Sequence, residues 1–389
     1  MAVWNYIWAV IRREFRIIQE HPIYIFGSVG VMLVCALFYF TFFKEGLPQD
    51  LPIGVVDNDN SSVSRNFRRQ LDATQLGKVI EFSDFSQARL QMQKGKIAGF
   101  CVIPKNMYSD LLANRQPSIT FYVNGLYFVS GALAYKDLLT MVNLTNGAVQ
   151  REVLRARGVP ENQIMGLIRP IDIDTHQIGN VYTNYGYYLS NIMIPGTLEL
   201  VIIIMVIYTL GMELKYETSR HLVKTAGGSI FNVLHGKLAI YTVLFSAIGL
   251  LLILAMYDWL DFPMEGSIWN MFLAVILLVL ASEAVAVFIF GCLPVPRLAL
   301  SIGALYSVLG FSLSGFTLPL EAMVPWIRGL AEAFPLRHYY LFYVQEDIFG
   351  AGFAGWWQEA IHMLLFLFVP LVVLPRLKGA FINQNFPKE

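Results

Sequence analysis

Long uninterrupted runs of apolar residues dominate the hydropathy pattern of the chain. The first run, from Ile23 to Phe43, contains no charged residue and is long enough to cross a hydrocarbon core of about 30 Å. Arginines precede the run, as in a signal peptide. However, the run exceeds the about 7–15 residues of a signal h-region and ends in aromatic rather than small residues. We therefore predict an uncleaved transmembrane helix over residues 23–43.

Further apolar runs in the second half of the chain have the same length and composition. They predict a transmembrane region over residues 188–375, and with the first run they predict a polytopic α-helical membrane protein with six transmembrane helices. The later five helices are expected at Tyr188–Leu210, Leu238–Tyr257, Ile268–Phe290, Leu298–Leu318 and Trp356–Pro375.

Residues 44–187 separate the first predicted helix from the second and show a different pattern. The short apolar run Ile53–Val56 is followed by a turn rich in Asp and Asn, which is typical of a buried strand. A helix capped by Ser61 or Ser62 is expected next, up to residue 72. Further strands are predicted at 100–103 and 119–123, and a long helix over 130–157. These elements predict an α/β domain inserted between the first and second transmembrane helices.

Basic residues indicate which side of the membrane each short segment occupies. Lys and Arg gather in one set of segments, whereas the opposite short segments, 258–267 and 319–355, carry only Arg328 and Arg337. By the positive-inside rule both termini are cytoplasmic, and the α/β domain is extracytoplasmic because long domains cross largely regardless of their charge. The cytoplasmic segments are then residues 1–22, the loop 211–237, the turn 292–297 and the tail 376–389.

The segment before the first transmembrane helix has a helical hydrophobic period. Apolar and aromatic residues recur at helical spacing, while arginines fall mostly on another face. The pattern predicts an amphipathic helix within residues 1–22 that lies in the cytoplasmic membrane interface. A helix packed on the protein's own core fits the pattern equally well, so both interpretations stay open. The apolar positions are Trp4, Ile7, Trp8, Ile11, Phe15 and Ile18.

Residues 319–355 are too interrupted to form a transmembrane helix. Pro319, Pro325 and Pro335 separate short apolar runs. Broken helices at membrane depth occur where protein buries them or where they line a cavity. We therefore expect a re-entrant pair of half-helices on the outer side.

Two acidic residues interrupt predicted transmembrane helices. An ionised carboxylate in mid-membrane costs at least about 2.5–3.5 kcal/mol, so Glu199 and Glu283 are expected to face the bundle interior, a cavity or a partner. One interpretation places them along a substrate pathway. The other is that each is a hydrogen-bonded structural glutamate at a contact between helices.

Composition supports the membrane assignment and excludes several other classes. The chain is 56% hydrophobic and 14% charged, whereas soluble domains average about 45–50% and about 25%. A net charge of zero gives no indication of a nucleic-acid partner. No CxxC pair or Walker A motif occurs, so we predict no metal, cofactor or catalytic site and no ATPase activity in this chain.

Three stretches of the chain resemble the ABC-2 type family of ABC exporter permeases. LPIGVVDNDNSSVSR at 51–65 is similar to the start of that family's large extracytoplasmic domain. The stretch from Leu313 through Pro319 to Phe334-Pro-Leu-Arg-His-Tyr339 resembles its fifth transmembrane helix and broken outer helix. The third stretch is the loop 211–237. The resemblance extends over essentially the whole chain.

That cytoplasmic loop typically shows E-x-E-x-G-T…L…P…G-K in the family. Glu213, Thr218, Leu222 and Gly236-Lys237 match it, whereas Lys215 and Glu217 replace the second acid and the glycine. Glu14-Phe15-Arg16 is similar to the family's interfacial N-terminal helix. The resemblance implies that the coupling residues toward an ATPase are Glu213, Lys215, Glu217, Thr218 and Arg220, and that Gly315, Pro319 and Pro335 belong to an outer gate.

The resemblance also implies partners. Two such permeases, identical or different, would pair and bind two cytoplasmic ABC ATPase subunits that carry the ATP and magnesium. Similar permeases with an external domain export drugs or other lipophilic molecules from the bacterial inner membrane. They often work with a periplasmic adaptor and an outer-membrane channel, and they contact membrane lipid.

Other functions remain open at this point. Export of a lipid-linked glycan or another polymer is the alternative within transport, although such relatives usually lack a large external domain. A membrane sensor would need a cytoplasmic output module larger than the loop 211–237. A secondary transporter would be expected to show inverted repeats, which the sequence does not contain.

Overall fold

The computed structural model divides the chain into two compact units. One comprises Met1–Lys44 together with Gln177–Glu389, and the other comprises Glu45–His176. The structure describes residues 2–43, 46, 49–74, 77–113, 115–125, 128–171, 174, 176, 178–180 and 184–384. The predicted domain boundary at residue 44 and the last five residues of the predicted tail lie outside this set.

The smaller unit is built on a four-stranded mixed sheet in the order β2-β1-β3-β4. The central strand β1 is parallel to both β2 and β3, whereas β3 and β4 are antiparallel. The strands are β1 (Leu51–Asp57), β2 (Gly77–Glu81), β3 (Gly99–Ile103) and β4 (Thr120–Val123). The predicted strands at 53–56, 100–103 and 119–123 are confirmed, and β2 is an additional strand.

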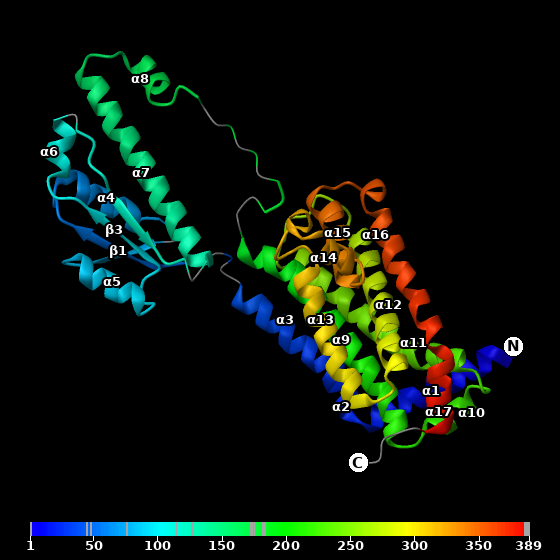
Figure 1. Cartoon of the computed structure of the whole chain (residues 1–389). Coiled ribbons are helices and arrows are strands. Elements are labelled where there is room, and N and C mark those ends of the chain that lie inside the picture. The colour runs from blue at the N-terminus through cyan, green and yellow to red at the C-terminus, as the bar shows by residue number, and fades with distance from the viewer. Residues whose placement is uncertain are drawn as a thin grey trace. The chain divides into compact units, whose positions relative to one another are not determined.

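Helices cover both faces of this sheet (Figure 1). Ile53 and Val55 pack on one face with residues of α4, α6 and α7, while their neighbour Val56 packs on the other face with Ala88 of α5. This alternation follows from the two-residue period of a strand. The predicted Ser61 cap is confirmed, because its side chain accepts a hydrogen bond from the Ser64 N–H. The helices are α4 (Ser62–Asp72), α5 (Phe85–Gln93), α6 (Met107–Leu112), α7 (Phe128–Ala156) and α8 (Glu161–Ile168).

The larger unit is helical. Within the described residues, six helices are long and apolar enough to cross a membrane, as predicted. They extend over Pro22–Phe42, Tyr185–Lys215, Ile230–Trp259, Ile268–Cys292, Pro296–Leu313 and Phe353–Val372. The second and third helices extend farther into the predicted loop 211–237 than the hydropathy pattern indicates.

Several of these long helices change their winding along their length. The first combines α2 (Pro22–Ile25), the π-helical turn η1 (Phe26–Gly30) and α3 (Val31–Phe42). The next four contain α9 (Tyr185–Lys215), α11 (Ile230–Leu254) with η2 (Ala255–Trp259), α12 (Ile268–Cys292) and α13 (Pro296–Leu313). The last combines α16 (Phe353–Leu365) with the 3₁₀ segment η5 (Phe366–Val372). The other elements are α1 (Ala2–Glu20), α10 (Ser219–Thr225), η3 (Leu320–Ala322), α14 (Pro325–Ala331), α15 (Pro335–Tyr343), η4 (Val344–Ile348) and α17 (Leu374–Asn383).

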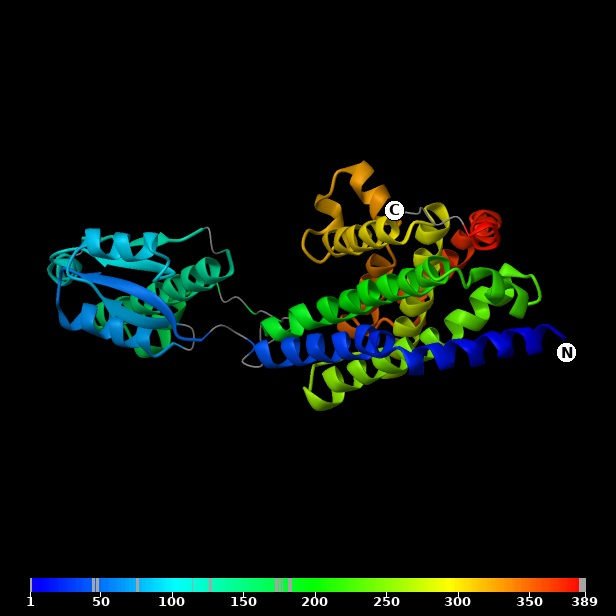
Figure 2. The same ribbon diagram turned by 90° about the horizontal axis from the view of Figure 1, so that it is seen from below.

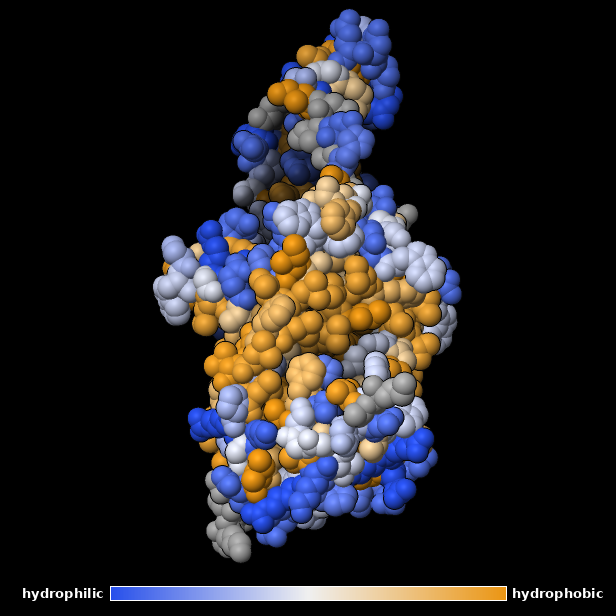
Figure 3. Space-filling model, turned by 90° about the vertical axis from the view of Figure 1, so that its right-hand side faces the viewer, coloured by the Kyte–Doolittle hydropathy of each residue, from blue (hydrophilic) through white to orange (hydrophobic). Residues whose placement is uncertain are grey.

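Two helices form the centre of the helical unit. In α9 and α12, 72% of the most apolar stretch is buried, compared with 28% or less in the other four long helices. The other helices surround this pair, and α3 runs alongside α9 (Figures 1 and 2). Apolar side chains cover the middle of the unit and give way to hydrophilic ones at its ends (Figure 3). We call the end that holds α1, α10 and α17 the basal end, and the end that holds α14 and α15 the apical end (Figure 1).

Small residues allow the helices around the central pair to approach closely. A Cβ atom at Gly249 of α11 would overlap the Val275 side chain of α12. A Cβ atom at Gly196 of α9 would likewise overlap Phe311 of α13. Small residues at helix contacts are typical of membrane bundles, where close van der Waals packing drives association.

Replacing Gly249 with leucine is expected to destabilise the helical unit. Overpacking a close helix contact typically costs about 1–3 kcal/mol. We therefore expect Gly249→Leu to lower the thermal unfolding midpoint of the purified protein in detergent by several degrees. The matched control is Gly379→Leu in α17, where no atom lies within 4 Å of an added Cβ. An equal midpoint in the two variants would contradict close packing at Gly249.

Candidate functional site

A cluster of buried charges joins three helices at the basal end. Glu14 of α1, Glu213 of α9 and Lys237 of α11 are 0%, 3% and 1% exposed. The Lys237 ammonium donates to Glu14 Oε2 at 2.6 Å and to Glu213 Oε1 at 2.9 Å. One lysine side chain therefore connects the carboxylates of two other helices.

Arg13 adds a second cation to the cluster. Its guanidinium donates to both Glu213 oxygens, at 2.7 and 2.9 Å, which is the bidentate geometry that strengthens an arginine–carboxylate pair. Burial works to lower the pKa of Arg13, but the hydrogen bond and the charge of Glu213 outweigh it and raise the pKa above its ordinary value. The Thr218 hydroxyl also donates to Glu213 Oε2, at 2.5 Å.

Hydroxyl groups satisfy the remaining oxygen of Glu14. Thr209 donates to Glu14 Oε1 at 2.9 Å, and the Tyr241 hydroxyl donates to the same atom at 3.0 Å. Two carboxylates and two cations thus share one hydrogen-bonded network whose formal charges cancel. We call Arg13, Glu14, Glu213 and Lys237 the basal charge cluster.

The cluster requires α1 and α11 to lie very close together. A Cβ atom at Gly236 would stand 2.6 Å from Val10 Cβ and 2.9 Å from the Ile7 carbonyl oxygen. Only glycine permits this approach, and Lys237 then enters the space next to Glu14. The Gly236-Lys237 pair singled out in the sequence therefore has a structural role, because it brings α1 against α11.

The predicted loop 211–237 consists mostly of helix. After α9 ends, Glu217 has a positive φ of 57° and the chain enters α10. Gly227 and Gly228, with φ of 68° and 76°, then lead into α11. Positive φ at both positions favours glycine.

The short helix α10 is fixed to α17. The Ser219 hydroxyl donates to the Phe381 carbonyl at 2.8 Å, and Arg220 Nε donates to the Ile382 carbonyl at 2.6 Å. The Gln384 amide also donates to the Glu217 carbonyl. These contacts hold the turn between α9 and α11 against the C-terminal helix.

The structure separates the five predicted coupling residues into two groups. Lys215, Glu217 and Arg220 are exposed at the basal end. Glu213 lies inside the basal charge cluster, and Thr218 is partly buried with its hydroxyl on Glu213. A soluble partner would therefore meet the first group, whereas the second group holds helices together.

Both intramembrane glutamates are buried, but they face different neighbours. Glu199 of α9 is 0% exposed, and within the described residues neither of its carboxylate oxygens has a hydrogen-bond partner. A Cβ atom at Gly310 of α13 would lie 3.7 Å from Glu199 Oε2 and 3.4 Å from the Phe334 ring. Glu199 therefore lies where α9 and α13 approach the residue that precedes α15.

Glu283 of α12 is 4% exposed. Its Oε2 accepts a hydrogen bond from Thr242 of α11 at 2.7 Å. This contact fits the interpretation of Glu283 as a structural glutamate between helices.

The broken outer segment, residues 319–355, forms the short elements η3, α14, α15 and η4. Pro325 and Pro335 each stand at the start of a helix, α14 and α15, where a missing N–H costs no hydrogen bond. Helix α15 is largely buried, whereas α14 is mostly exposed. Of the predicted gate residues, Gly315 has a φ of 95° and lies two residues after the end of the fifth long helix, Pro319 caps η3, and Pro335 begins α15.

Two neighbouring acids anchor the end of α15, and the sequence patterns did not reveal them. Glu346 Oε1 accepts from the Ser267 N–H at 2.7 Å and from the Asn270 amide at 2.8 Å. Asp347 accepts from the Tyr187 hydroxyl at 2.7 Å, and burial raises its pKa to about 6. The apical segment is thereby tied to the ends of α9 and α12.

One group of side chains has the composition of a metal site. The ligand atoms of His338, Glu359 and His362 all lie within 4.8 Å of one another. However, His338 Nδ1 is 2.7 Å from Glu359 Oε2, and its Nε2 is 3.1 Å from the Glu332 carbonyl oxygen. These hydrogen bonds account for the cluster as a connection between α15 and α16.

The arrangement defines a polytopic α-helical membrane protein, with apolar helices around a central pair and a polar network at each end. The model of the ABC-2 family transporter proteins matches residues 22–374, and the chain belongs to this family. The inner membrane transport permease YhhJ of Escherichia coli (strain K12) is 25% identical over 266 residues, which cover 67% of each chain. The YhhJ permease of Shigella flexneri shows the same values. The family supplies the transmembrane component of transporters, which is not itself an ATPase, and implies an ABC ATPase partner in general.

Removing one member of the basal charge cluster is expected to destabilise the protein. Lys237→Met leaves two buried carboxylates with one cation, and breaking a buried pair in this way costs about 3–5 kcal/mol. The thermal unfolding midpoint in detergent should fall accordingly.

The double variant Glu14→Gln/Lys237→Met restores neutral charge and keeps acceptors for Thr209 and Tyr241. We expect the thermal unfolding midpoint of the double variant to return most of the way to that of the unaltered protein. Equal or greater destabilisation in the double variant would show that the charge balance of the cluster is unimportant.

Proposed function

We propose that this permease is the membrane-spanning subunit of an ATP-driven exporter whose ATPase is a separate polypeptide. The observation that carries the proposal is the basal charge cluster. It joins α1 to the ends of α9 and α11, next to a short helix whose charged residues face outward. A partner that pushes on α1 or α10 would therefore move the transmembrane helices directly.

Two ABC ATPase subunits, holding ATP and magnesium, would dock at this end of a permease dimer. Lys215, Glu217 and Arg220 are exposed and supply the contact residues. Glu213 and Thr218 act indirectly, because they transmit displacement of the α9–α10 turn to α1 and α11 through the cluster. The permease itself carries out no covalent chemistry.

In this proposal the basal end is cytoplasmic and the protein lies in the bacterial inner membrane. The concentration of Lys and Arg in the basal segments supports the orientation. The α/β unit is then extracytoplasmic, where it would meet a periplasmic adaptor that leads to an outer-membrane channel. The printed name of the YhhJ relatives, an inner membrane transport permease, fits the same location.

We propose lipophilic small molecules, including drugs, as the exported substrates. Glu199 supports this assignment because its unpaired buried carboxylate can bind a cationic or hydrogen-bond-donating group among the apolar helices. It also lies near Phe334, which directly precedes α15. Substrate bound at Glu199 would therefore displace the start of the outer segment. Gly315, Pro319 and Pro335 then allow that segment to open outward.

The orientation can be tested by thiol labelling of exposed positions. In a variant lacking Cys35, Cys101 and Cys292, a single cysteine is introduced at His221 or at Ser109, both of which are exposed. We expect an impermeant maleimide to label Ser109→Cys in cells with a permeabilised outer membrane and to label His221→Cys only after the inner membrane is opened. The reverse pattern would refute the proposed topology.

Coupling can be tested by reversing an exposed charge at the basal end. Glu217→Lys should leave the amount of folded permease unchanged but reduce co-purification of the ATPase and substrate-stimulated hydrolysis by tenfold or more, because charge reversal at an interface costs a few kcal/mol. The purified permease alone should hydrolyse no ATP.

The matched control is Glu321→Lys, which reverses an exposed glutamate at the apical end. It should leave both measurements at the level of the unaltered protein. If Glu217→Lys behaves like this control, the α9–α10 turn is not the docking surface.

A further inference from the structure

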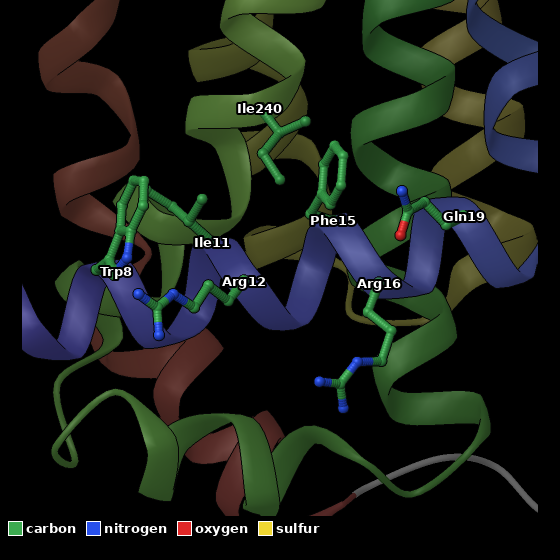
Figure 4. A pocket seen from close by; sticks show the side chains of 7 residues that line it. All are labelled: Trp8, Ile11, Arg12, Phe15, Arg16, Gln19 and Ile240. Atoms are coloured by element: carbon green, nitrogen blue, oxygen red, sulfur yellow. The ribbon is translucent and has the colours of Figure 1, made fainter.

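The N-terminal helix has an outward face as well as the inward face that joins the basal charge cluster. Its inward residues Val10, Glu14 and Ile18 are buried. On the outside, a groove of about 470 Å³ lies between α1 and α11 (Figure 4). It is lined by Trp8, Ile11, Arg12, Phe15, Arg16 and Gln19, with Ile240 of α11 at its far wall.

The groove separates apolar from charged side chains. The side of α1 that faces Ile240 of α11 carries Trp8, Ile11 and Phe15 (Figure 4). Ile240 points toward these three side chains (Figure 4). Arg16 lines the same groove, but its side chain extends away from Ile240 (Figure 4). A ligand that fits would carry an apolar portion toward the transmembrane helices and a polar portion away from them.

The two arginines of the groove are available to an anion. Arg12 and Arg16 are exposed and lie four residues apart, which places them on one face of the helix. Across the described residues, neither guanidinium forms an ion pair, in contrast to the adjacent Arg13 with its bidentate carboxylate. Arg12 instead lies over the Trp8 ring, with its guanidinium carbon 5.6 Å from the ring centroid.

The aromatic residues place this groove at the membrane surface. Trp8 and Phe15 are 55% and 54% exposed, and the first transmembrane helix begins at Pro22, only two residues after α1 ends. Exposed aromatic and basic side chains beside a helix end are typical of the interface between hydrocarbon and headgroups. Ile240 belongs to a long apolar helix, so the groove opens where acyl chains begin.

We propose that the groove between α1 and α11 binds one anionic phospholipid. Arg12 and Arg16 hold the negatively charged headgroup through its phosphate, and Trp8, Phe15 and Ile240 contact the upper part of an acyl chain. Charge complementarity favours a lipid with a net negative headgroup over a zwitterionic one. Because Arg13 and Glu14 anchor the same helix to the cluster, the bound lipid holds α1 along the membrane surface.

Fluorescence quenching in vesicles tests the proposal on the full chain. Trp8 emission is isolated as the difference between the unaltered protein and Trp8→Phe. The probes are phosphatidylglycerol and phosphatidylcholine brominated on the acyl chain, each titrated into vesicles of unbrominated phosphatidylcholine. We expect brominated phosphatidylglycerol to quench Trp8 at much lower mole fractions than brominated phosphatidylcholine.

Removing the two arginine charges distinguishes a site that binds a lipid headgroup from a helix that only lies in the bilayer interface. Arg12→Gln/Arg16→Gln should weaken the apparent affinity for phosphatidylglycerol roughly thirtyfold. The matched control, Lys224→Gln/Arg376→Gln, removes two exposed charges elsewhere at the basal end and should leave it unchanged. Both pairs lie on the surface, and an unchanged thermal midpoint verifies that each variant is folded.

Two results would overturn the proposal. Equal quenching by the two brominated lipids, unaffected by the arginine substitutions, would mean that α1 only lies in the interface and selects no headgroup. Loss of phosphatidylglycerol quenching when the ATPase subunit is added would mean that this face belongs to the protein partner. Neither result depends on transport activity, so the test stands apart from that of the proposed function.

Discussion

Burying three charged side chains beside a fourth, partly buried one is the constraint on which the basal end of this permease depends. Each ion loses its hydration when buried, and only its oppositely charged partners and hydrogen bonds compensate for that loss. Arg13, Glu14, Glu213 and Lys237 meet this condition only when α1, α9 and α11 are all in place. The network therefore specifies one arrangement of these helices and penalises any other.

Helix α9 connects the basal charge cluster to the apical end of the helical unit. Glu213 near its basal end belongs to the cluster, and Tyr187 near its apical end binds Asp347 of the outer segment. Glu199 lies between them, about 21 Å along the helix from Glu213 at 1.5 Å per residue. One continuous and largely buried helix thus carries Glu199 and connects the polar networks at the two ends of the unit.

The sequence predicts the elements of this fold better than it predicts their contacts. Hydropathy identifies the six long helices, and the short apolar runs identify three of the four strands. The strand β2 was missed because Lys78 and Glu81 dilute its apolar pattern. The sequence singles out Glu14, Glu213 and Gly236-Lys237, but not as one site, since Lys237 is 223 positions from Glu14 and 24 from Glu213. Arg13, the fourth member, is 200 positions from Glu213. Their pairing, like the hydrogen bonds of α10 to α17, depends on tertiary packing that local patterns do not contain.

The central claim is that the basal charge cluster makes α1 and the adjacent ends of α9 and α11 move as one body. Double electron–electron resonance between spin labels at Asn5 on α1 and His235 on α11, both exposed, tests it most directly in the assembled transporter. The account predicts the same distance distribution without nucleotide and with ATP trapped in the ATPase subunits, and a broadened one in Lys237→Met. A shift between the two nucleotide states of the unaltered protein would contradict it.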